Sequence, residues 1–113
     1  MKSMSYATLA AAVAFAAMSL GVSPAARAEA AAGLALAQQQ NCMSCHSVAR
    51  PFMGPALHDV AARYAGRQDA STYLTHKILD GSSGVWGQVP MPANTQLTPE
   101  QAATLASWVL TLK

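Results

Sequence analysis

The sequence predicts an all-α domain of three or four short helices with one long loop. No stretch alternates apolar and polar residues in the way that a half-buried strand does. Several stretches instead begin at a proline or a capping residue and end at a glycine, which is typical of short helices. Residues 81–97 hold three glycines and two prolines and show no helical period. A loop of this length in so small a domain is usually functional.

The amino terminus has the pattern of a secretory signal peptide. A short basic start at residues 1–5 precedes an apolar run at 7–20, which is too short to span a bilayer comfortably. Ala26-Arg27-Ala28 then has the small-x-small pattern of a signal cleavage site. We therefore expect residues 1–28 to be a cleaved signal peptide, residues 29–113 to form the domain, and the mature protein to be exported to the periplasm. A retained membrane anchor is the alternative.

The predicted mature chain has no charge excess. Of the 113 residues, 28 belong to the expected signal, so 85 remain. Lys2 and Arg27 leave with the signal, which reduces the basic residues from seven to five and matches the five acidic ones. There is thus no basic patch of the kind that binds nucleic acid. A domain of this length is marginal for a self-sufficient core, and such domains often recruit a stabilising group.

Start and stop signals place the first two helices. The first is expected from Ala30 to Gln40, with Gly33 open to a close approach by another element. The second is expected from Ala56 to Ala65, where Pro55 opens it and Gly66 ends it.

The third helix is expected from about Ala70 to Leu79. Asp69 or Ser71 is its candidate N-cap, and Gly81 is its expected end.

The last helix has the strongest start signal in the chain. Thr98 can cap it, Pro99 takes the first helical position, and Gln101 completes a capping box. The helix should run to about Leu112. Its apolar stripe consists of residues at helical spacing: Ala102, Leu105, Val109 and Leu112.

Cys42-Met43-Ser44-Cys45-His46 has the pattern of a c-type haem attachment site. Each thiol can add to one haem vinyl group and leave a thioether. The adjacent His46 can then present a ring nitrogen to the iron as the proximal ligand. A structural disulfide, a thioredoxin-like redox pair and half of a zinc site are the alternatives. No second cysteine pair completes a zinc site, and no α/β frame supports the redox pair.

A single axial histidine leaves the sixth position of the iron to be assigned. The candidates are Met91, His58, His76, another methionine, or no ligand at all. His58 and His76 lie in predicted helices beside charged residues, which favours surface positions. Met91 lies between Pro90 and Pro92 in the long loop, where the prolines restrict the backbone. An isolated methionine usually fills a core, but this setting makes Met91 the better ligand candidate.

Further short motifs follow the attachment site along the mature region: Gly54-Pro55, Asp59 to Ala62 (DVAA), Gly81 to Gly87 (GSSGVWG), Pro90-Met91-Pro92 and Trp108 to Leu110 (WVL). With these motifs the chain resembles the class I c-type cytochromes, and most closely the small bacterial cytochrome c-551 type. The resemblance covers the whole mature region. It implies three to four helices wrapped around one covalently bound haem c, with a long loop that carries a methionine.

The resemblance also implies roles for individual residues at the iron. Cys42 and Cys45 would carry the thioethers, and His46 and Met91 would be the iron ligands. The carbonyl of Pro55 would accept the second imidazole N–H of His46 and thereby fix the ring.

Other implied roles concern the rim of the haem. Trp86 would donate its indole N–H to a propionate, and Asn94 would form a hydrogen bond near the Met91 sulfur. Lys77 stands where the family often has a propionate-binding arginine, and lysine lacks the bidentate fork of arginine. Contact between the first and last helices is implied as well, with Gly33 and Leu105 as candidate participants.

The expected function is electron transfer rather than catalysis. An iron with both axial positions filled has no open site for a substrate, so we expect a monomeric, periplasmic carrier that shuttles single electrons between membrane-bound or periplasmic respiratory redox proteins. The rivals are an enzyme or gas sensor with five-coordinate haem and a structural module with a Cys42–Cys45 disulfide. Apolar residues expected to flank the haem edge and to form a weak docking surface are Met43, Phe52, Met53, Val89, Pro90, Pro92 and Ala93. The alternative is that several of them pack on the porphyrin.

Overall fold

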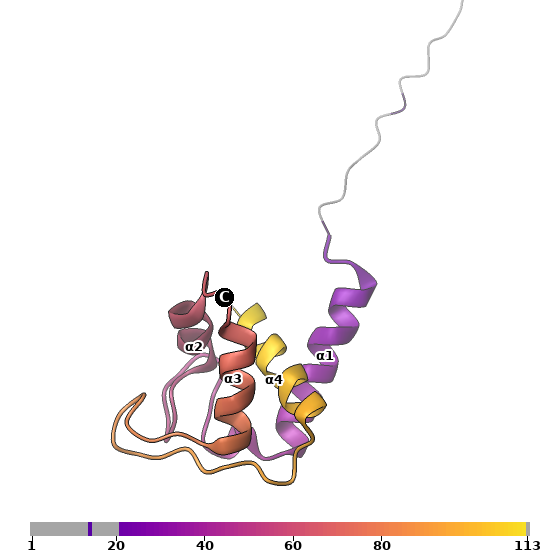
Figure 1. Ribbon diagram of the computed structural model, residues 1–113. Helices are drawn as coiled ribbons and strands as arrows, with labels where there is room; N and C mark the ends of the chain where they lie inside the picture. Colours follow the sequence, from indigo (N-terminus) through magenta and orange to yellow (C-terminus); the bar gives the residue numbers. More distant parts are fainter. Residues whose placement is uncertain (1–13, 15–20, 113) are drawn as a thin grey trace, which may run out of the picture.

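The computed structural model describes residue 14 and residues 21–112 (Figure 1). The basic start and nearly all of the apolar run of the expected signal peptide lie outside these residues. The described part contains four α-helices and one short 3₁₀ helix: α1 (Pro24–Gln39), η1 (Cys42–Ser44), α2 (Leu57–Tyr64), α3 (Ala70–Asp80) and α4 (Pro99–Thr111). Its one β-type pairing is an isolated antiparallel bridge between Ser82 and Met91. The prediction of an all-α fold is confirmed.

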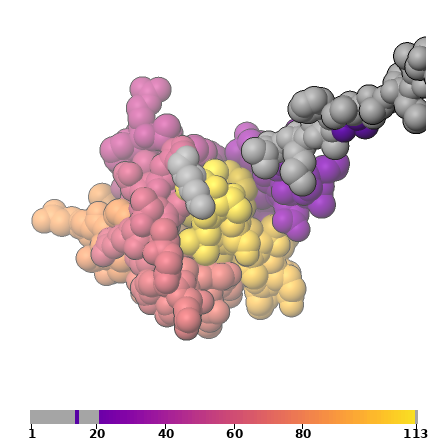
Figure 2. Space-filling model, turned by 90° about the horizontal axis from the view of Figure 1, so that it is seen from above, coloured from indigo at the N-terminus to yellow at the C-terminus, as the bar shows by residue number. Residues whose placement is uncertain are grey.

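α4 is the central helix. It contacts α1, α2 and α3, and Figure 2 shows it in yellow between α1 and the other two helices. The predicted capping box is present, because Thr98 Oγ1 accepts from the Gln101 N–H at 3.1 Å and Gln101 Oε1 accepts from the Thr98 N–H at 3.0 Å. The buried residues of α4 face the other helices: Ala102, Leu105, Ala106, Trp108 and Val109.

Gly33 allows α1 to lie directly against α4. A Cβ atom at this position would overlap with Cβ and Cγ of Trp108. The predicted close approach is therefore confirmed, but the side chain that fills the space is Trp108. Leu105, the expected participant, lies in the core with 2 % of its surface exposed.

The start of α1 differs from the prediction. The helix begins at Pro24 rather than Ala30, because Ser23 caps it and Pro24 occupies the first turn. Ser23 Oγ accepts from the Ala26 N–H at 3.2 Å. The expected cleavage point after Ala28 thus lies inside α1, in a part of the helix whose residues, 24–32, are all exposed. No helix among the described residues has the length and apolar content needed to cross a membrane.

The second and third helices lie close to their predicted positions. α2 is one residue shorter at each end than expected, and Pro55 precedes its N-cap, Ala56, instead of opening the helix. Asp69 is the N-cap residue of α3 but makes no capping hydrogen bond. Its carboxylate instead accepts from Arg67 Nε at 2.9 Å and Arg67 Nη2 at 2.8 Å. Gly81 ends α3 with φ +75°, as predicted.

Candidate haem site

The attachment segment forms one tight turn directly after α1. Asn41 ends the helix region in the left-handed conformation, at φ 60°, and η1 begins at Cys42. The Cys42 carbonyl accepts from the Cys45 N–H at 3.2 Å and from the His46 N–H at 3.0 Å. This turn holds both cysteines and the imidazole on one short, hydrogen-bonded segment, and Cys42 and Cys45 form no disulfide with each other. Burial raises the pKa of the Cys42 thiol above its ordinary value.

The His46 ring is fixed by the loop that follows it. His46 Nδ1 lies 2.8 Å from the carbonyl oxygen of Pro55, so the protonated Nδ1 donates and Nε2 keeps its lone pair. The contact expected from the resemblance is therefore present. Gly54 presses against the ring, since a Cβ atom there would lie 2.6 Å from His46 Cε1. A histidine held in this way is prepared to bind a metal through Nε2.

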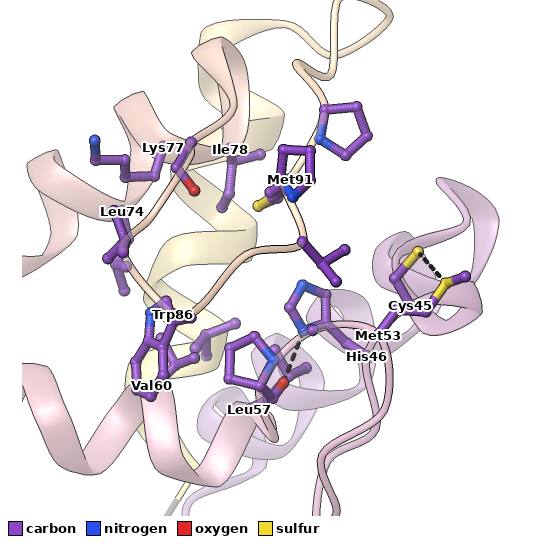
Figure 3. A pocket seen from close by; sticks show the side chains of 18 of the residues that line it. Cys45, His46, Met53, Leu57, Val60, Leu74, Lys77, Ile78, Trp86 and Met91 are labelled. Atoms are coloured by element: carbon purple, nitrogen blue, oxygen red, sulfur yellow. Dashed lines mark hydrogen bonds between the residues drawn. The ribbon is translucent and has the colours of Figure 1, made fainter.

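The ring lies in the wall of an apolar cavity of about 350 Å³. A second hollow of about 310 Å³ shares His46, Leu57 and Met91 with it and reaches Cys42. Ligand sites in proteins commonly have volumes of a few hundred Å³ and are mostly apolar. Figure 3 shows the His46 ring and the Met91 sulfur facing the same cavity.

Met91 is held in place by backbone contacts within the long loop. Ser82 and Met91 exchange two backbone hydrogen bonds, at 3.0 and 2.9 Å, which close the loop at its base. Asn94 ties the next segment to the end of α3, because its Nδ2 donates to the Ile78 carbonyl at 2.9 Å. Its Oδ1 accepts from Gln96 Nε2 at 3.2 Å. The observed role of Asn94 is thus to anchor the loop, and a hydrogen bond to the Met91 sulfur stays a prediction.

Lys77 and Trp86 lie at the other end of the cavity from Cys45 and Met53 (Figure 3). Lys77 Nζ lies 5.3 Å from the centre of the Tyr73 ring, and 39 % of the Trp86 surface is exposed. A haem has its vinyl groups and its carboxylates on different edges. The cavity therefore offers a cysteine at one end, a cation and an indole at the other, and an apolar wall between, which fits a covalently bound haem.

The two histidines that are alternative ligand candidates, His58 and His76, lie outside the cavity. Neither His58 nor His76 lines either hollow. His76 lies at the surface, where its Nδ1 is 3.9 Å from Asp80 Oδ2. His76 is thus exposed as expected, whereas His58 is half-buried.

Sequence reasoning missed several residues that shape the site. Gly54 belongs to the Gly54-Pro55 motif, but its contact with the His46 ring was not predicted. Arg63 and Arg67 were not considered, although they lie over aromatic rings beside the cavity. Tyr64 and Tyr73, whose ring centres are 5.1 Å apart, line the cavity as well. Their spacing of nine residues, on two different helices, carries no local signal.

Comparison with known proteins agrees with this geometry. Residues 30–113 match the family model for cytochrome c. The chain belongs to the cytochrome c family. Cytochrome c-552 of Nitrosomonas europaea is 55 % identical over 78 residues, which are 69 % of this chain and 76 % of that protein. Cytochrome c-551 of Pseudomonas denitrificans is 47 % identical over 81 residues, 72 % of this chain and 98 % of the relative.

A solved structure supports the same assignment. The crystal structure of Nitrosomonas europaea cytochrome c552 superposes with a TM-score of 0.69 at 54 % identity, and the match covers 71 % of this chain and 99 % of that one. This cytochrome c accordingly has the class I fold and carries one covalently attached haem c, with Cys42, Cys45 and His46 in the attachment motif. It is an electron carrier and not an enzyme.

Proposed function

We propose that this cytochrome c is a periplasmic carrier in which His46 and Met91 would hold the haem iron. The main support is the position of both side chains on the wall of one apolar cavity. When bound, the haem supplies a one-electron ferric/ferrous couple. With both side chains bound, the iron would have no position left for a substrate, which suits outer-sphere transfer to another redox protein. A thioether ligand also raises the reduction potential.

The protein holds both ligands by contacts that do not involve the iron. His46 is fixed by the Pro55 carbonyl, and Met91 by its paired hydrogen bonds with Ser82. Each side chain can therefore keep its position in either oxidation state. Little rearrangement should accompany the gain or loss of an electron, which is the property that a carrier needs.

Lys77 and Trp86 are proposed to contact the haem propionates. Both line the cavity at the end away from Cys45. The Lys77 ammonium over the Tyr73 ring and the partly exposed Trp86 indole provide a positive charge and an N–H donor at one edge. Hydrogen bonds and positive charge both favour an ionised carboxylate, so these residues should influence the potential through the propionates.

Exposed apolar side chains near the cavity are proposed to form the docking surface for redox partners. Phe52, Met53 and Val89 are 68 %, 56 % and 64 % exposed, and Met53 and Val89 also line the cavity. Pro90, Pro92 and Ala93 are exposed too, whereas Met43 packs against the core. A small surface of this kind suits brief encounters between a monomeric carrier and membrane-bound or periplasmic respiratory redox proteins.

Export to the periplasm is proposed to follow cleavage after Ala28. The residues of α1 that cleavage removes are exposed, so their loss takes away no core contact. Mass spectrometry of the exported protein tests this together with haem attachment. The expected mass is that of residues 29–113 plus one haem, and haem lost on acid–acetone extraction would contradict attachment at Cys42 and Cys45.

The absorption spectrum of the oxidised protein tests the ligands. Iron bound by methionine has a weak far-red band in the ferric state, and we expect this band here. A five-coordinate or bis-histidine spectrum without the band would refute the assignment of Met91.

A further inference from the structure

Arg63 joins the last turn of α2 to the long loop. Its Nη1 donates to the Val85 carbonyl at 3.0 Å, across 22 residues of sequence. The same guanidinium lies over the Trp86 ring, with Cζ 4.4 Å from the ring centre. One side chain thus holds the peptide before Trp86 and also covers one face of its indole.

The loop around Trp86 has few other constraints. Its base is closed by the two backbone hydrogen bonds between Ser82 and Met91. Within residues 83–90, the loop is linked to a helix by the hydrogen bond from Arg63 to the Val85 carbonyl. Gly84 and Gly87 flank the segment at φ +74° and +123°, and a Cβ atom at either would meet nothing within 4 Å. Trp86 also packs edge-on against Tyr64, with ring centres 6.4 Å apart. Without Arg63, glycines on both sides would leave the indole free to turn.

We propose that Arg63 is a positioning residue that holds the Trp86 indole toward the haem carboxylates. The inference rests on the proposed contact between Trp86 and a propionate. The guanidinium suits this task because it can stack on a ring and donate a directed hydrogen bond at once, whereas an ammonium presents only a point charge. Lys77 lies over Tyr73 and lacks that fork, so the orientation of donors at this edge depends on Trp86 and hence on Arg63.

The first test is proton exchange at the Trp86 indole in the reduced holoprotein, followed by NMR in Arg63→Lys and Arg63→Gln. Trp108 is an internal reference, since it packs against Gly33 and is 7 % exposed. Arg67→Gln is the matched control, because Arg67 lies over the Tyr64 and Tyr73 rings, whereas the hydrogen bond to Val85 and the stacking on Trp86 come from Arg63. Both Arg63 variants should speed Trp86 exchange about tenfold, which corresponds to a loss of about 1.4 kcal/mol. Trp108 exchange, and Trp86 exchange in Arg67→Gln, should stay at the parent rate.

The second test is the pH dependence of the reduction potential. Loss of the indole donor should raise the pKa of the propionate, so the pH at which the potential changes should move upward in Arg63→Lys although the charge is kept. In a Trp86→Phe background, Arg63→Lys should cause no further change in the pH dependence of the potential, because Arg63 acts on the propionate through Trp86.

Three results would overturn the proposal: parent-like Trp86 exchange in Arg63→Lys, equal acceleration of both indoles, or an equal effect of Arg67→Gln. A missing far-red band in the parent would instead refute the Met91 assignment. The exchange measurement would still decide the role of Arg63 in that case.

Discussion

Replacement of Gly33 by alanine tests the packing of α1 on α4. The added Cβ would overlap with Cβ and Cγ of Trp108. Cβ is fixed by the backbone, so no change of rotamer can move it away. Overpacking of this kind costs about 1–3 kcal/mol, and we expect the upper end of that range. Alanine gains about 1 kcal/mol over glycine in a helix. The net result should be a loss of about 2 kcal/mol.

Thermal unfolding of the holoprotein measures this effect. For a domain of this size about 1 kcal/mol shifts Tm by roughly 4–8 °C, so Gly33→Ala should unfold about 8–16 °C below the parent. The control is the same substitution in a Trp108→Ala background. There Cγ and Cδ1 of residue 108 are absent and only the contact with its Cβ remains, so Gly33→Ala should lower Tm less than it does in the parent. A Tm that rises in the parent background would show that α1 and α4 do not meet as described.

Three further predictions concern the rim of the site and the surface. Gly54→Ala should displace the His46 ring, because the new Cβ would lie 2.6 Å from Cε1; we expect a lower Tm and a changed haem absorption spectrum, and a parent-like spectrum would contradict this contact. Hydrogen bonds from Arg67 lower the pKa of Asp69, so Asp69 should stabilise the fold above the ordinary pKa of aspartate and lose this effect as the pH falls through its own lowered pKa. Asp69→Asn should therefore lower Tm slightly at neutral pH, and the difference from the parent should vanish in acid; a difference that grows in acid would refute the sign. Lys77→Ala should alter the pH dependence of the reduction potential, and an unchanged titration curve would count against its contact with a propionate.

The sequence predicted correctly the features that depend on a few adjacent residues. The capping box of Thr98 and Gln101 and the stop at Gly81 are properties of a few adjacent residues, and both are present in the structure. The attachment motif likewise lies within one turn. The Ser23–Pro24 start signal of α1 is equally local. It was not used to place the helix, because it lies in the stretch interpreted as a signal peptide.

Contacts between distant residues were beyond the reach of sequence patterns. The close approach at Gly33 was predicted, but the position of Trp108 over it depends on how α4 is rotated about its axis. The hydrogen bond from Arg63 to Val85 depends on the path of a glycine-rich loop. The contact of His46 with Pro55 was expected only through the resemblance to a family, since the eight intervening residues have no regular structure and do not determine it.

The rate at which carbon monoxide binds the reduced protein tests the central claim most directly. If Met91 fills the sixth position, the parent should bind carbon monoxide slowly or not at all, and Met91→Ala should bind it rapidly. Met43→Ala is the control, because Met43 adjoins the attachment cysteines but lines neither hollow, and it should behave as the parent does. If the parent and Met91→Ala bind carbon monoxide at the same rate, Met91 is not the ligand.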